Sequence, residues 1–157
     1  MKSPILIFCT LAFAIISCKK DAPVSPVETP APPKQATIEE LVVGKWKPEV
    51  YTTTVYAADG SVSQPAKDSA PGQYDGLTLE ANFTYTQTGF KITSGTYSIQ
   101  KLSASSGTIN NLILTSSSLN TTYKINSVTA TQLILEYSSV NASNVKTVVV
   151  YKYNKTN

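Results

Sequence analysis

Few side chains in this 157-residue sequence could carry out covalent, acid–base or metal chemistry. The chain contains two cysteines, Cys9 and Cys18, no histidine, and 13 basic residues that are all lysines. Histidine is the side chain most often used as a general base and as a metal ligand, so both roles lose their usual candidate. The serines and lysines show no spacing that singles out a nucleophile and its base. We therefore predict no catalytic residue, no metal site and no cofactor, and we expect the protein not to be an enzyme.

Carboxylates are the remaining candidates for catalysis, because a pair of them could serve glycoside hydrolysis. Asp75, Glu80 and Glu136 lie in or beside predicted strands. The alternation of those strands places Glu80 and Glu136 on the face opposite the apolar side chains. We interpret both as solvated surface charges.

Cys18 is the one residue whose surroundings indicate a covalent modification. Lys2 precedes an apolar run over residues 5–16 that only Thr10 interrupts, and Ser17 and Cys18 follow it directly. A run of this length suits the hydrophobic part of a secretion signal, and it is shorter than the roughly 20 apolar residues that span a bilayer.

This arrangement resembles the lipobox of bacterial lipoproteins, although an ordinary signal peptide with an incidental cysteine is the alternative. The resemblance implies that residues 1–17 are a lipoprotein signal peptide and that Cys18 carries acyl chains such as palmitate. Two or more such chains hold a protein stably on a membrane, since each buried CH₂ contributes about 0.8 kcal/mol. In Gram-negative bacteria an aspartate after the cysteine retains a lipoprotein at the inner membrane, and here Lys19 follows instead. We therefore expect a lipid-anchored protein of the outer membrane, facing the periplasm or the cell surface.

Residues 18–36 are predicted to be the lipidated cysteine and a tether. The segment 21–36 reads DAPVSPVETPAPPKQA and holds five of the nine prolines of the chain. Proline fixes φ and lacks a backbone donor, so this segment cannot form a helix or join the interior of a sheet. We expect an extended spacer of about 3.1 Å per residue. A proline-rich recognition segment is the alternative.

Residues 37–157 are expected to form one all-β domain. Thr37 and Glu40 form a capping-box pattern that predicts a short helical turn, which Gly44 ends. Strand candidates rich in Thr, Tyr, Val, Ile and Leu follow at nearly regular intervals. They cover residues 45–57, 74–80, 83–90, 95–101, 109–115, 121–128, 132–138 and 145–153. We predict an eight-stranded antiparallel up-and-down barrel, with a β-sandwich as the alternative.

Residues 59–73 are predicted to be the longest loop, with Asp59 and Gly60 in a tight turn inside it. Asp68-Ser69-Ala70 resembles a three-residue acceptor motif for O-glycosylation at Ser69, but we interpret the segment as an ordinary loop. The period of two predicts which side chains of the strands face the barrel interior. These are Trp46, Val50, Thr52, Thr54, Tyr56, Leu77, Leu79, Phe83, Tyr85, Tyr97, Ile99, Leu112, Leu114, Tyr123, Ile125, Leu133, Leu135, Val148 and Val150.

The order of several short motifs resembles the lipocalins, and more closely the small bacterial lipocalin-like lipoproteins. The motifs are Gly44-Lys45-Trp46, residues 75–79 (DGLTL), residues 83–86 (FTYT) and Gly95-Thr96-Tyr97, and the resemblance covers residues 37–153. It implies a barrel with a possible apolar pocket. Lipocalins proper place an arginine of the last strand on the tryptophan. This chain has no arginine, so Lys146 or Lys152 is expected there. The C-terminal helix of lipocalins is also missing.

An eight-stranded barrel is just wide enough to be filled by side chains or to hold one small ligand. The candidate lining residues are Trp46, Tyr85, Tyr97 and Tyr123, which join an apolar body to a polar tip. We expect a membrane-anchored lipoprotein that binds a small apolar or amphipathic ligand. The alternative is a non-catalytic envelope interaction or inhibitor protein with a filled barrel core. The net charge is only +3 and the lysines are scattered, so we expect no nucleic-acid partner, and we expect a monomer.

Overall fold

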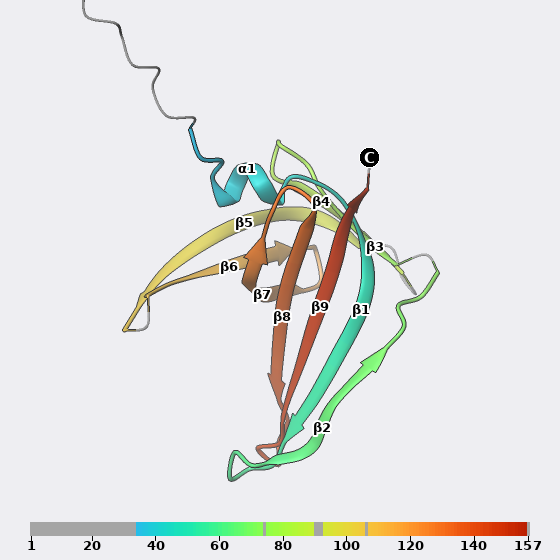
Figure 1. The fold of residues 1–157 in the computed structure, drawn as a ribbon, viewed down its shortest axis with the longest axis vertical. Helices are drawn as coiled ribbons and strands as arrows, with labels where there is room; N and C mark the ends of the chain where they lie inside the picture. The colour runs from blue at the N-terminus through green and yellow to red at the C-terminus, as the bar shows by residue number, and fades with distance from the viewer. Residues whose placement is uncertain (1–33, 74, 90–92, 106, 157) are drawn as a thin grey trace, which may run out of the picture. The chain divides into compact units, whose positions relative to one another are not determined.

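A computed structural model describes residues 34–73, 75–89, 93–105 and 107–156 of the chain (Figure 1). The predicted signal peptide, Cys18 and nearly all of the predicted tether lie outside these residues. The chain divides into two units, Met1–Lys34 and Gln35–Asn157, and the second contains the folded domain.

The described residues form one helix and nine strands. In chain order they are α1 (Ile38–Val42), β1 (Gly44–Tyr56), β2 (Val62–Ser69), β3 (Gly76–Leu79), β4 (Thr84–Thr88), β5 (Thr93–Ala104), β6 (Gly107–Thr115), β7 (Asn120–Val128), β8 (Gln132–Val140) and β9 (Lys146–Thr156). Strands β1 and β3 to β9 pair in sequence, all antiparallel, and β9 pairs with β1 to close an eight-stranded barrel. The predicted all-β barrel is confirmed, and the closed ring excludes the sandwich alternative.

Helix α1 begins with the predicted capping box. The Thr37 hydroxyl accepts a hydrogen bond from the Glu40 backbone N–H at 3.3 Å, and the Glu40 carboxylate accepts one from the Thr37 N–H at 2.8 Å. The helix ends at the extended residue Val43, and Gly44 already belongs to β1, which corrects the predicted helix stop. The indole N–H of Trp46 donates to the Val42 carbonyl at 2.7 Å. Trp46 thereby satisfies one of the carbonyls that a helix end leaves open.

The Gly44-Lys45-Trp46 segment lies at the start of β1, where Lys45 pairs with Thr156 and Trp46 with Lys155 of β9. Gly44 has a φ of +145°, and a Cβ there would collide with the side chain of Lys155. The Lys155 ammonium lies 5.0 Å from the centre of the Trp46 ring, within the range of a cation–π contact. The lysine on the tryptophan is therefore Lys155, and the expectation of Lys146 or Lys152 is wrong.

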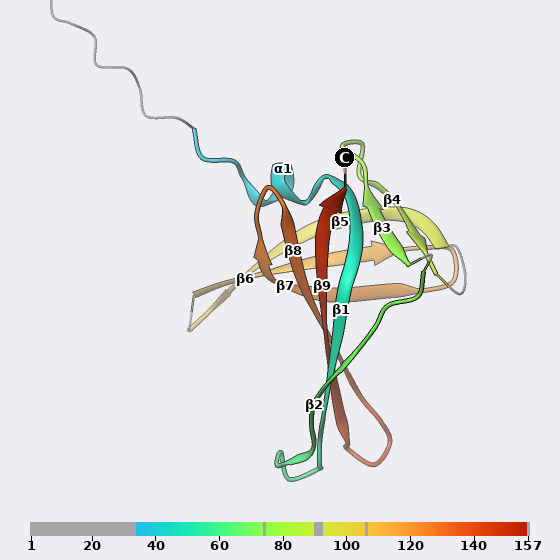
Figure 2. The same ribbon diagram turned by 45° about the vertical axis from the view of Figure 1, so that its right-hand side comes forward.

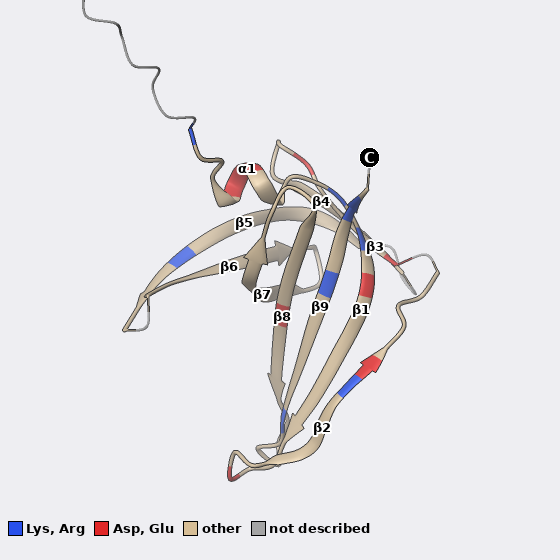
Figure 3. Cartoon of the chain, viewed as in Figure 1, with Lys and Arg blue, Asp and Glu red and all other residues tan. Residues whose placement is uncertain are grey.

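The two other lysines have different partners. The Lys146 ammonium lies 6.0 Å from the centre of the Tyr56 ring. Lys152 forms an exposed ion pair with Glu49 at 2.9 Å. Lysines, aspartates and glutamates are spread over many elements of the described domain and do not gather on one strand (Figure 3).

Most of the predicted interior residues are buried. The confirmed set is Trp46, Leu77, Leu79, Tyr85, Tyr97, Leu112, Leu114, Tyr123, Ile125, Leu133 and Leu135. Ile99 is partly buried against this cluster, and Val42 and Tyr153 complete it.

The prediction for the second half of β1 is wrong because of a bulge. The register between β1 and β9 shifts between Pro48 and Val50, so Glu49 is an extra residue in β1. One extra residue reverses which side chains face the interior. Tyr51 therefore faces the interior, and its ring meets the Tyr151 ring at 5.0 Å. The predicted residues Val50, Thr52, Thr54 and Tyr56 lie in the opposite phase.

Strand β9 corrects the prediction in the same way. Tyr153 is buried and Tyr151 packs against the core, whereas Lys152 between them pairs with Glu49 outside. Val148 and Val150 are on the same face of β9 as Lys152, because the pairing of β8 with β9 has no irregularity that would change the alternation. The predicted inward positions of these two valines are wrong.

Phe83 was predicted to be inside and is instead 54% exposed. The Phe83 N–H donates to the Glu80 carbonyl at 3.0 Å, and the Glu80 N–H donates to the Thr84 carbonyl at 2.9 Å. This is a three-residue hairpin loop whose last position is left-handed, and Phe83 occupies it with a φ of +63°. The turn geometry directs the Phe83 side chain out of the barrel. The centre of its ring lies 5.7 Å from the centre of the Tyr97 ring.

The predicted loop 59–73 instead contains strand β2, which is additional to the eight strands of the ring. It pairs with the second half of β1 and lies outside the ring (Figure 2). Its eight residues are all exposed, so it has no apolar face that could have predicted a strand. The predicted turn before it is confirmed: the Asp59 carboxylate accepts from the Ser61 N–H at 2.9 Å, and Gly60 has a φ of +84°.

Candidate binding site

The barrel interior has an apolar end and a tyrosine-rich end. At the end covered by α1, leucines pack around Trp46, and Trp46 lies opposite Leu77 in the register of β1 with β3. Further along β1, Tyr51 lies opposite Tyr151 of β9. The largest fully buried side chains are Val42, Trp46, Leu77, Leu79, Leu112, Leu133 and Leu135. Side chains therefore fill the end next to α1.

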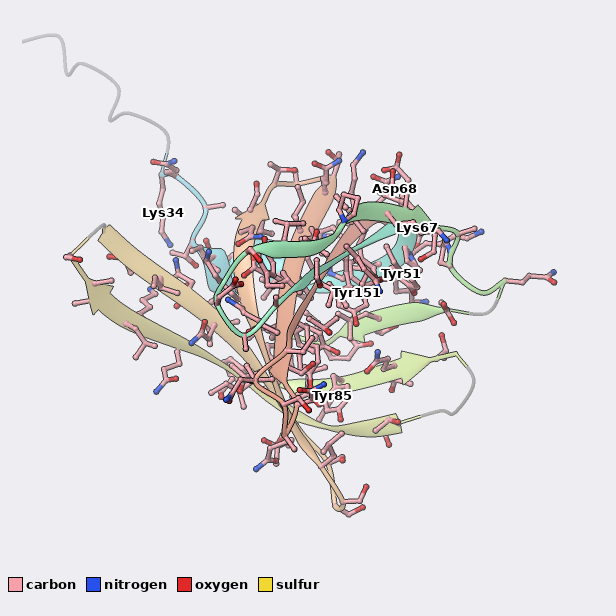
Figure 4. The ribbon with its side chains drawn as sticks, turned by 90° about the horizontal axis from the view of Figure 1, so that it is seen from below. Lys34, Tyr51, Lys67, Asp68, Tyr85 and Tyr151 are labelled. Carbon is pink, nitrogen blue, oxygen red and sulfur yellow. The ribbon has the colours of Figure 1, made fainter. Side chains whose placement is uncertain are left out.

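A cavity of about 250 Å³ lies at the tyrosine-rich end. Strands β1, β3, β4, β5 and β9 and the segment before β3 contribute its lining. The lining residues are Tyr51, Asp75, Gly76, Gln87, Thr88, Gly89, Thr93, Tyr151 and Tyr153. Seen from below, Tyr51 and Tyr151 lie together in the interior, whereas Lys67 and Asp68 lie on the outer strand β2 (Figure 4).

The aromatic wall of the cavity is held by ring contacts. The Tyr151 ring meets that of Tyr51 edge-on at 5.0 Å, meets that of Tyr123 edge-on at 5.7 Å, and stacks on that of Tyr153 at 6.4 Å. Tyr123 also contacts Tyr137, with 5.9 Å between ring centres. Aromatic pairs in such arrangements contribute about 0.5–1.5 kcal/mol beyond the area they bury. Tyr151 is thus the centre of the wall.

Asp75 places a carboxylate at the edge of this wall. Its Oδ2 accepts one hydrogen bond from the Tyr51 hydroxyl at 2.8 Å and another from the Gly72 N–H at 2.7 Å. A Cβ at Gly72 would lie 2.9 Å from Oδ1, and one at Gly89, where φ is +155°, would lie 2.8 Å from it. Both positions therefore have to be glycine for the carboxylate to fit in its present place.

The environment of the tyrosines keeps their hydroxyls protonated. Burial raises the pKa of Tyr51 well above its usual value, and the hydrogen bond to Asp75 and the charge of that residue add to the effect. Burial raises the pKa of Tyr123 to about 12. Burial also raises the pKa values of Tyr151 and Tyr153. These phenols therefore stay uncharged hydrogen-bonding groups to a higher pH than exposed tyrosines do.

The raised tyrosine pKa values predict a loss of stability in alkali. An unfolded chain releases tyrosine protons near pH 10, whereas folded Tyr123 holds its proton to about pH 12. Ionisation therefore favours the unfolded state within that window, at a cost of roughly 2–3 kcal/mol for Tyr123 alone. Urea unfolding at neutral pH and at steps from pH 10 to pH 12 should show a falling free energy of unfolding. A native far-UV spectrum with all tyrosinate absorbance appearing near pH 10 would contradict this account.

The four residues predicted to bind a ligand lie at different depths. Trp46 is in the filled end, where its indole N–H is already used by Val42. Tyr97 donates to the Glu80 carbonyl at 2.9 Å.

Tyr97 also lines a separate hollow of about 380 Å³ beside α1, together with Phe83. Tyr123 is buried and does not line the cavity, and its ring contacts that of Tyr151, which does. Tyr85 is buried, and it pairs with Leu79 of β3 on one side and with Gly95 of β5 on the other. A ligand-binding role for these four residues stays a prediction.

None of the four predicted residues lines this cavity, and none of its nine lining residues, among them Tyr51, Asp75 and Tyr151, was assigned to a ligand site from the sequence. The bulge at Glu49 concealed the inward phase of Tyr51. Asp75 was noted only as a carboxylate near a strand, because its hydrogen bond to Tyr51 joins segments 24 residues apart.

Over the described part of the chain, no group of three or more His, Cys, Asp and Glu residues is placed to hold a metal ion. No helix within residues 34–156 is long and apolar enough to cross a membrane. A comparison with family models, curated proteins and solved structures finds no match for this chain.

Proposed function

We propose that the protein is a lipid-anchored, lipocalin-like binding module of the outer membrane that holds a small amphipathic ligand at the tyrosine-rich end of its barrel. The cavity formed by Tyr51, Asp75 and Tyr151 is the observation that carries the proposal. The anchor rests on the sequence around Cys18, and the proposed role is non-catalytic.

The chemistry of the cavity favours an amphipathic ligand over a wholly apolar one. Most of the surface that lines the cavity is polar, with Asp75, Gln87 and Thr88 able to orient a ligand, and the tyrosine rings add a smaller apolar part. A volume of about 250 Å³ suits a small molecule or the head of a longer one. Because leucines and Trp46 fill the other end, the ligand would enter at the tyrosine-rich end and stop there.

A second candidate function is the interaction or inhibitor protein with a filled core. The exposed ring of Phe83 favours it, because an aromatic side chain at a left-handed turn position costs about 1–3 kcal/mol and gains little burial there. Phe83 and Tyr97 line the hollow beside α1, which would then receive part of a protein partner.

One set of full-length variants tests the first proposal. In a Gram-negative host, wild type should fractionate with membranes. A variant in which an ordinary cleavable signal peptide replaces residues 1–17 and serine replaces Cys18 should be soluble. The soluble variant needs no detergent, so organic extraction and mass spectrometry can identify a molecule that co-purifies with it. Adding Thr93→Phe fills the cavity and should abolish the co-purified molecule. Adding Thr86→Phe, at an exposed position on the adjacent strand outside the lining, should leave it bound.

Two results would overturn the proposal. Membrane sedimentation of the variant with the ordinary signal peptide and Cys18→Ser equal to that of wild type would remove the anchor. A co-purified molecule that binds Thr93→Phe and Thr86→Phe equally, or no such molecule in any variant, would remove the cavity as the site.

A further inference from the structure

We propose that the ligand of the tyrosine-lined cavity is a small organic cation, an amine or a quaternary ammonium, with its charge between the Asp75 carboxylate and the rings of Tyr51 and Tyr151. This inference rests on the proposed function, since it assumes that the cavity binds a ligand, and it adds the chemical class of that ligand.

Asp75 is a carboxylate without a cation. Elsewhere in the described domain, Glu39 pairs with Lys101 and Glu49 pairs with Lys152, each at 2.9 Å. Asp75 has no such partner among the described residues, and the cavity lining contains no lysine. A carboxylate inside a partly enclosed site is most favourable when an opposite charge compensates it. A bound cation would supply that charge.

The hydrogen bonds of Asp75 leave one of its oxygens available. Both the Tyr51 hydroxyl and the Gly72 N–H donate to Oδ2. Within the described residues, no donor is directed to Oδ1. The Tyr51 and Gly72 bonds therefore fix the orientation of the carboxylate, and Oδ1 remains as the acceptor for a ligand.

The tyrosine rings favour the same kind of ligand. The face of an aromatic ring attracts a cation within about 6 Å, and the attraction reaches about 2 kcal/mol when water is excluded. Tyr51 and Tyr151 are edge-to-face, so at least two differently oriented ring surfaces border the cavity. Several aromatic rings beside one carboxylate form the kind of cage that binds quaternary ammonium groups.

The neighbouring surface argues against an anionic ligand. Lys45 and Lys47 line a different hollow, which shares only Asp75, Gly76 and Thr88 with the cavity. No described lysine ammonium could therefore compensate a negative ligand inside the cavity, and Asp75 would repel it. A neutral polyhydroxylated ligand would also use aromatic rings and a carboxylate, and the test separates it from a cation.

The test compares three probes with a shared benzyl or phenyl group on the soluble Cys18→Ser protein, made with the ordinary signal peptide that is removed on export. They are benzyltrimethylammonium, benzyl alcohol and benzenesulfonate, and binding is followed by NMR shifts of the tyrosine ring protons. The cation should bind at least about tenfold more tightly than either other probe, a difference of about 1.4 kcal/mol. Its affinity should fall with added salt.

Asp75→Asn is the decisive variant. Asparagine keeps an oxygen that can accept from Tyr51 and Gly72, so the fold should persist while the charge is lost. We expect cation binding to weaken at least about tenfold. Asp68→Asn is the matched control, because Asp68 is an exposed carboxylate that also accepts a hydroxyl hydrogen bond, from Thr52 at 2.6 Å. It should leave the affinity unchanged.

A second variant guards against misfolding of Asp75→Asn. Tyr151→Leu keeps an apolar side chain but removes the ring. It should weaken the binding of the cation more than the binding of benzyl alcohol. If benzyl alcohol binds as well as the cation and Asp75→Asn has no effect, while Thr93→Phe abolishes both, the cation inference is wrong and the binding function stands. If no probe binds any variant, both proposals are overturned.

Discussion

Replacing Gly95 by alanine is expected to destabilise the domain by at least about 3 kcal/mol, or to prevent its folding. Gly95 pairs with Tyr85 of β4, and the next residue of β5 already pairs with Thr115 of β6. A Cβ at Gly95 would collide with the Thr115 carbonyl oxygen and would lie 3.0 Å from the Tyr85 ring. The first obstacle is a backbone atom of the neighbouring strand β6, so no rotation of a side chain could relieve the collision. Urea unfolding followed by circular dichroism measures the loss.

Gly60→Ala is the control for that prediction. A Cβ at Gly60 meets nothing within 4 Å, and the only cost comes from its φ of +84°. That cost is about 1–2 kcal/mol. Equal losses for the two substitutions would show that the contact between β5 and β6 at Gly95 is less close than described.

Trp46→Ala is expected to cost about 3–5 kcal/mol, the range for removing a buried aromatic side chain. The ring is 2% exposed, it carries the Lys155 ammonium on its face, and its N–H satisfies the Val42 carbonyl. The substitution removes all three interactions at the point where α1 meets the barrel. Thermal or urea unfolding should show the loss, and amide exchange should show the first opening in α1.

Two milder variants separate these interactions. Trp46→Phe keeps an aromatic ring but leaves the buried Val42 carbonyl without its donor, which should cost about 1–3 kcal/mol. Lys155→Met keeps the aliphatic stem over Gly44 and removes only the charge, so we expect a loss of about 1 kcal/mol or less. A loss in Lys155→Met as large as that in Trp46→Ala would contradict the central role of the indole.

The sequence was sufficient for the fold where strands alternate cleanly. Leu77 and Leu79 stand between glycine or polar neighbours, and Tyr123 and Ile125 between polar ones, so their inward phase could be predicted and is confirmed. The capping box of α1 was predictable for the same reason, because its partners are three residues apart and need no tertiary information.

The sequence could not predict which side chains face the interior where tertiary contacts decide this. The apolar run 148–150 has no alternation of its own, and only the pairing of Lys152 with Glu49 shows which face is outside. Glu49 as an extra residue in β1 is visible only against its partner β9. Strand β2 exists because β1 offers it an edge, and its own residues give no periodic signal.

The candidate site was less predictable than the fold. Its lining joins residues from five strands whose alignment around the ring depends on register and on the bulge. The sequence indicated that tyrosines would line a pocket, but the two that it named in the middle of the barrel, Tyr85 and Tyr123, are buried and do not line the cavity. It could not bring Asp75 and Tyr51 together, because their hydrogen bond depends on the path of the chain through β2.

Strand β2 has a consequence for how crowded copies of this protein would behave. The second half of β1 extends beyond its pairing with β3, and without β2 its backbone would be open to a strand from another molecule. The outer side of β2 is a poor template for such growth, since Pro65 lacks an N–H and Lys67 adds charge at an irregular stretch of the pairing. Strand β2 therefore makes edge-to-edge growth from this part of the domain unfavourable, and the proposed lipid anchor, by concentrating the protein on a membrane, would make that protection matter most.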